Sequence, residues 1–155
     1  SDGLTPDEAT WAPNPESNSI AFLLWHVARA EDSWVNRVIL REEELYEAEG
    51  WQQKLGTPAR EGGAGYTVEQ LQIWPVPELG LLQGYADSVR KKTLDFLQSV
   101  TDEKLSEVAR PERSQDTVGA MLCHLITELA LHVGQIDYLR GMRRRMISPD
   151  QRYWR

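Results

Sequence analysis

The sequence is poor in the features that mark secreted or membrane-spanning proteins. It has a single cysteine, Cys123, which excludes an intramolecular disulfide and is typical of a reducing compartment. No apolar run approaches the roughly 18 residues that a membrane span needs. The opening segment, SDGLTPDEAT, does not have the pattern of a signal peptide. We therefore expect a cytoplasmic protein with no membrane partner.

Basic residues are also scarce relative to acidic ones. The chain carries 17 lysines and arginines against 24 aspartates and glutamates, which gives a formal net charge of −7. Because nucleic-acid-binding proteins normally show a basic patch, this balance argues against a nucleic-acid partner. Strand-like alternation, internal repeats and low-complexity segments are absent as well. A length of 155 residues and a hydrophobic content of 41% are typical of one globular domain.

Apolar residues recur at helical spacing in three long segments, at about 19–40, 77–99 and 117–141. Short helical turns are predicted at Thr5–Thr10, which has a threonine cap and an early proline, and around Trp51–Leu55. The inward positions predicted for the first long helix are Ile20, Leu23, Leu24, Val27, Ala30, Trp34 and Val38. Those predicted for the last one are Leu122, Leu125, Ile126, Leu129, Val133, Ile136 and Leu139.

These segments predict one all-α domain over residues 1–155. It has an irregular lead-in at 1–18, a long loop at 50–76 and a basic tail at 143–155. Three long helices are one fewer than a four-helix bundle contains. We expect either that a leading helix precedes residue 1, or that a partner subunit or the loop region fills the remaining groove.

The last helix carries a carboxylate and an imidazole beside its apolar face. Glu128 and His132 are four residues apart, so their side chains are neighbours on the helix surface. An ionised carboxylate there is costly unless it is paired or binds a metal. With His26 of the first helix facing across the bundle, the pair would complete a site of two imidazoles and one carboxylate. Alternatively, the histidines are ordinary packing residues and Glu128 forms a structural ion pair with Arg29 or Arg140.

Other residues are candidates for supporting roles. His124 lies two turns, roughly 12 Å, from His132, so one metal cannot easily bind both and we leave His124 out of the ligand set. Its open roles are a fourth ligand, a base near the metal, or a surface residue. Gln135 is a candidate for orienting a ligand. Trp34 and Tyr85 are candidates for lining a pocket, although large residues on bundle helices are more often core. Glu31 and Asp32 are predicted to be solvated or ion-paired.

Two segments, NSIAFLLWHVARAEDSW (18–34) and HLITELALHVGQIDYLRG (124–141), resemble the DinB superfamily. LTPDEATWAPNPESNSI (4–20) and LYEAEGWQQKLG (45–56) are similar to it too, so the likeness spans nearly all of residues 4–142. The resemblance implies a four-helix bundle that holds one divalent metal through three side chains from two helices, often in a homodimer. The family's first helix would precede Ser1.

Glu128, four residues before His132, resembles the branch that contains the N-terminal domain of mycothiol-dependent maleylpyruvate isomerase and related thiol transferases. The implied ligand set is His26, Glu128 and His132. Zinc, nickel or iron suits these donors. The resemblance implies transfer of a low-molecular-weight thiol, mycothiol or bacillithiol, to a small electrophile. The nucleophile would be a metal-bound thiolate or water, and no catalytic side chain is assigned. The alternatives are a metal-assisted hydrolase and a non-catalytic, dimeric, stress-linked bundle with a structural metal.

Overall fold

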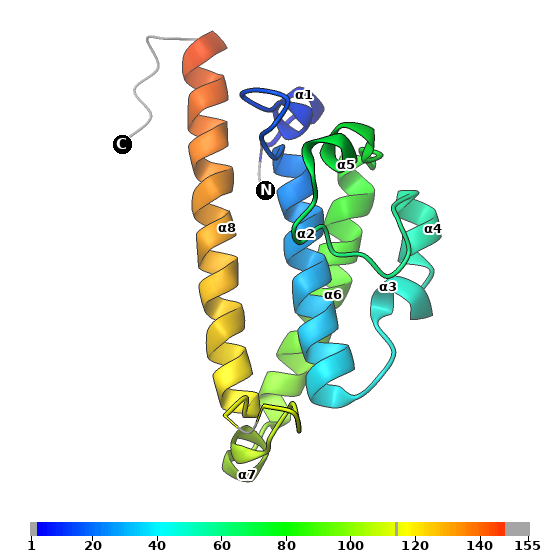
Figure 1. The fold of residues 1–155 in the computed structure, drawn as a ribbon, viewed down its shortest axis with the longest axis vertical. Coiled ribbons are helices and arrows are strands. Elements are labelled where there is room, and N and C mark those ends of the chain that lie inside the picture. The colour runs from blue at the N-terminus through cyan, green and yellow to red at the C-terminus, as the bar shows by residue number, and fades with distance from the viewer. Residues whose placement is uncertain (1–2, 114, 148–155) are drawn as a thin grey trace.

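Three long helices form the body of the molecule in a computed structural model that describes residues 3–113 and 115–147 (Figure 1). They are α2 (Ile20–Asp32), α6 (Leu79–Ser99) and α8 (Val118–Ile147). Helix α2 packs against both α6 and α8 and is therefore the central element. A short helix, α1 (Pro6–Thr10), precedes α2. The other short helices lie in the connections between the long ones: α3 (Leu45–Ala48), α4 (Trp51–Leu55), α5 (Val68–Ile73) and α7 (Asp102–Ser106).

The expected all-α class is confirmed, since the described residues form an isolated bridge between Val108 and Thr117 but no β-strand. The short helices predicted near residues 5–10 and 51–55 are present as α1 and α4. Among the described residues, no helix combines the length and the apolar composition needed to cross a bilayer.

Local sequence signals set where the helices begin. The Thr5 side chain accepts a hydrogen bond from the Glu8 backbone amide, and the Glu8 carboxylate accepts one from the Thr5 backbone amide. Pro6 is the first residue of α1. The Ser19 hydroxyl caps α2 through the Phe22 amide. After Asp32 the helix widens into a π-helix, η1 (Ser33–Leu40), so the predicted first helix of 19–40 changes its winding in its second half.

The apolar core has three parts. The largest fills the space between α2 and α6 and includes Phe22, Trp25, Tyr46, Leu82, Tyr85 and Val89. The other two lie along the contact between α2–η1 and α8, here called the α2–α8 seam. One contains Ile20, Leu23 and Leu139. The other contains Ile39, Ala109, Val118 and Met121.

Helix α8 differs from its prediction in two respects. It continues through Gly141 to Ile147, because one glycine inside a long helix costs only about 1 kcal/mol. Ile126 and Val133, predicted to face inward, are 66% and 53% exposed. The packed face instead runs through Met121, Leu125 and Leu139, with Glu128 and His132 at its centre. The polar pair therefore lies in the middle of the seam and not on its flank.

The described part of the predicted basic tail, residues 143–147, forms the end of α8. Arg144 donates from Nε to Glu8 Oε1 at 2.6 Å. This hydrogen bond holds the pKa of Glu8 below its usual value. Residues 148–155 of the predicted tail lie outside the described residues.

A buried polar network joins α2 to α3 and α6. The Asp32 carboxylate, with no exposed surface, accepts hydrogen bonds from the amides of Leu45 and Tyr46 at 2.9 Å and from the Tyr85 hydroxyl at 2.7 Å. Arg29 donates to the same hydroxyl and to Glu44. Burial and the Asp32 charge raise the pKa of Tyr85 well above its usual range, so that its hydroxyl remains a donor.

The expectation that Glu31 and Asp32 are solvated is therefore wrong, whereas ion pairing is found for both. Glu31 is 3% exposed and pairs with Arg90 at 2.8 Å. Asp32 lies 3.6 Å from Arg29. The helical wheel missed their burial because α2 is covered on several sides, by α6, α8 and the segment that contains α3.

Replacing Asp32 by alanine should destabilise the fold strongly, because two backbone amides and the Tyr85 hydroxyl lose a buried acceptor. We expect the free energy of unfolding in urea to fall by about 3–5 kcal/mol. Asp95→Ala is the matched control: its carboxylate is 53% exposed and pairs with Lys91 on the same helix, so a change of about 0.5 kcal/mol is expected. Equal losses in the two variants would contradict a structural role for the network.

Candidate metal centre

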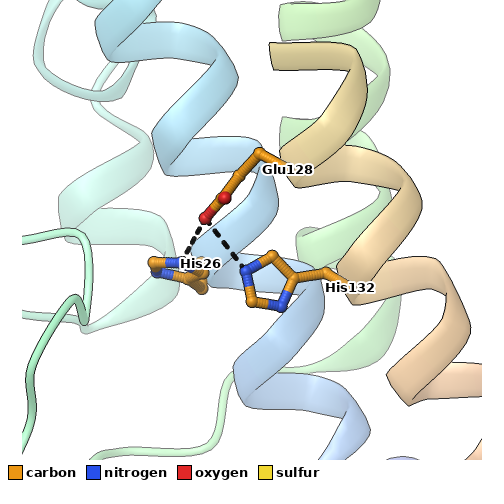
Figure 2. A group of neighbouring side chains, drawn as sticks. All are labelled: His26, Glu128 and His132. Carbon is orange, nitrogen blue, oxygen red and sulfur yellow. Dashed lines mark hydrogen bonds and ion pairs between the residues drawn. The ribbon is translucent and has the colours of Figure 1, made fainter. Parts of the chain in front are cut away.

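Three side chains from two helices converge at the centre of the α2–α8 seam (Figure 2). His26 comes from the middle of α2, and Glu128 and His132 come from successive turns of α8. Glu128 Oε1 lies 3.1 Å from His132 Nε2 and 3.7 Å from His26 Nε2. Each residue offers one ligand atom, and the three atoms lie within 4.8 Å of one another. The side chains are largely shielded from solvent, with 13%, 28% and 15% of their surfaces exposed for His26, Glu128 and His132.

Hydrogen bonds on the far side of each ring orient the two imidazoles. His26 Nδ1 contacts the carbonyl oxygen of Gly62, and His132 Nδ1 lies 2.9 Å from Gln135 Oε1. Both partners are acceptors, so each Nδ1 must carry the proton. In the neutral rings the lone pairs are then on the Nε2 atoms, which face Glu128.

This arrangement of donor atoms suits either a hydrogen bond between His132 Nε2 and Glu128 Oε1, which lie 3.1 Å apart, or a shared cation. A single divalent ion would satisfy all three donors at once. Tetrahedral ligands at about 2.0 Å from zinc are separated by roughly 3.3 Å, and the observed 3.1 Å and 3.7 Å lie on either side of that value. The residues present therefore fit a divalent metal.

A cavity of about 590 Å³ adjoins two of the three side chains. His26 and Glu128 form part of its wall, and Trp34 and Arg37 of η1 form another part. The long loop contributes Arg60, Gly62 and Ala64. Arg37 is engaged by Glu44, which also pairs with the buried Arg29 at 2.6 Å. The cavity thus connects the ligand atoms to a space large enough for a small molecule.

The structure separates the supporting residues that the sequence suggested. Trp34 lines the cavity and stacks on the exposed ring of His124, with centroids 4.9 Å apart. His124 itself is outside the convergent group of three. Gln135 contacts His132. The suggestion that Tyr85 lines a pocket is wrong: it is fully buried and bonded to the Asp32 network, because its hydroxyl points into the core between α2 and α6.

Two features of the site were not foreseen. The Gly62 carbonyl is a partner of His26, yet a loop backbone 36 residues away leaves no periodic signal in the sequence. The only available hint was the Gly62–Gly63 pair within the long loop. Arg29 was considered as a partner for Glu128, but it pairs with Glu44 and Asp32 instead.

Comparison with known proteins gives a family for this chain. A family model described as the DinB superfamily matches residues 2–136. A solved structure of a conserved protein from Enterococcus faecalis superposes with a TM-score of 0.78 at 26% identity, over 88% of this chain and 82% of that chain. Among proteins of curated function, none matches. The chain belongs to the DinB superfamily. Four expectations stay predictions: that the chain binds a metal, which metal it is, that a thiol is the cosubstrate, and that the protein is a homodimer.

Removing one of the three convergent side chains should remove metal binding. We expect the wild-type protein to bind about one zinc ion per chain, and His132→Ala to lose binding measurable by isothermal titration calorimetry. His124→Ala is the matched control, since it deletes an imidazole of the same helix that lies outside the convergent group. Equal affinities for wild type and His132→Ala would contradict this ligand set.

Proposed function

We propose that the protein is a metal-dependent enzyme that transfers a low-molecular-weight thiol to a small electrophile. A divalent ion, zinc or nickel in the first instance, would be held by His26, Glu128 and His132. The observation that carries the proposal is the cavity of about 590 Å³ whose wall includes His26 and Glu128. A purely structural metal is normally enclosed by four protein ligands, whereas only three converge here and two of them border an open cavity.

The chain's own residues supply orientation. Gly62 and Gln135 accept hydrogen bonds from the two Nδ1 atoms and so hold both Nε2 atoms toward the same point. Trp34 presents an apolar ring surface on which an organic electrophile can rest. When bound, a divalent ion supplies Lewis acidity, which lowers the pKa of a thiol or water in contact with it.

The transfer itself balances without an oxidant or a reductant. The thiol loses its proton to solvent through the open cavity, a bond forms between sulfur and the electrophilic carbon, and the leaving group departs with its electron pair. The described residues around the three donors provide no second thiol for this step, because Cys123 is exposed on α8 and is absent from the cavity wall.

Zinc- or nickel-loaded protein should accelerate conjugation of bacillithiol or mycothiol to monochlorobimane, measured by mass spectrometry of the conjugate. The experiment uses the Cys123→Ser protein, so that the exposed cysteine does not itself consume the electrophile. We expect the rate to require both metal and thiol and to fall to the uncatalysed level in His132→Ala.

Two outcomes would overturn the proposal. Metal-dependent hydrolysis of a nitrophenyl ester without any thiol, together with no conjugation, would indicate a hydrolase in which water is the nucleophile. Full metal occupancy with neither reaction would indicate a bundle with a non-catalytic metal.

A further inference from the structure

The segment Glu61–Gly63 of the long loop lies against one face of α2. Arg29 donates from Nε to the carbonyl oxygen of Glu61 at 2.9 Å, and His26 donates from Nδ1 to that of Gly62. The α2 residues that meet the loop are spaced at positions 22, 25, 26 and 29, which is one helical face. Two successive loop carbonyls are therefore fixed by α2, and one of them fixes a candidate metal ligand in return.

Gly63 makes this close approach sterically feasible. Its φ of +79° is in the left-handed region, and a Cβ added there would lie 2.6 Å from Phe22 Cζ and 2.9 Å from Trp25 Cζ3. These rings cannot easily yield, because both pack against Trp74, with centroid separations of 5.3 Å and 5.4 Å. Any side chain at position 63 would thus push the loop, and the neighbouring Gly62 carbonyl with it, away from α2.

We propose that Glu61–Gly63 is a positioning element of the metal centre, and that docking of this segment and metal binding favour each other. The proposal rests on the metal centre proposed above. With the loop docked, the Gly62 carbonyl keeps the proton on His26 Nδ1 and leaves Nε2 free for an ion. With the loop displaced, His26 loses that acceptor and can rotate or adopt the other tautomer. Because coupling between two binding events is reciprocal, a bound metal must in turn stabilise the docked loop.

Gly63→Ala tests the positioning role, with Gly65→Ala as a matched control. Gly65 has a similar φ of +72°, but an added Cβ there would meet no atom of the described chain within 4 Å. Both variants place a side chain in the strained left-handed backbone region, whereas only Gly63→Ala displaces the Gly62 carbonyl. We expect the zinc affinity of Gly63→Ala to fall about 10–100-fold, the range typical for losing the partner of a ligating histidine. Gly65→Ala should retain the wild-type affinity.

Amide hydrogen exchange of the wild-type protein is measured with and without zinc. A glycine that only maintains the fold would give no zinc-dependent change in the loop. This measurement also tests the proposal if Gly63→Ala does not fold. Zinc should slow exchange across residues 60–66 and leave α7, at the far end of α8, unchanged (Figure 1). If the wild type binds zinc while loop exchange is unaffected, or if both glycine variants bind equally well, the positioning role is refuted and the metal centre stands. If the wild type binds no zinc, both proposals fail.

Discussion

The site depends on one arrangement, in which two imidazole Nε2 atoms and a carboxylate oxygen meet between two helices. The helices do not need these polar groups to stay together. Apolar clusters lie along the same seam, one around Ile20 and Leu139 and the other around Val118 and Met121. Side-chain packing of this kind fixes the separation of α2 and α8, and with it the distances between the three donors. The apolar clusters therefore preorganise the polar centre.

A second layer of structure reaches the centre through α2. Asp32 and Arg29 lie one to two turns beyond His26 on this helix and gather α3, α6 and the long loop around it. Arg29 links the core network to the loop. Its Nη atoms donate to Tyr85 and Glu44, and its Nε donates to the Glu61 carbonyl, next to Gly62. The orientation of His26 is thereby tied to the main core between α2 and α6, and not only to the seam.

What could be predicted from the sequence follows the geometry of single helices. The spacing of Glu128 and His132 forces them together on any helix, and the scarcity of histidines pointed to His26 as their partner. The packed face of α8 could not be predicted in the same way, because Ile126 and Val133 are apolar yet largely exposed. Tyr85 was considered for a pocket and Gly62 was missed. Their roles depend on contacts with residues 53 and 36 positions away in the chain. Long-range contacts of this kind leave no local period.

The two apolar clusters of the seam have a further consequence for how the proposed metal centre would be loaded. In small zinc domains the metal assembles the fold, and the chain is unfolded without it. Here α8 is anchored on α2 by Leu139 at one end and on η1 by Val118 and Met121 at the other. The ligands are therefore in place before any ion arrives, and loading is a separate event from folding. Because two imidazoles and a carboxylate accept several divalent ions, the metal bound at such a centre would be set by the supply around the protein and by exchange through the cavity.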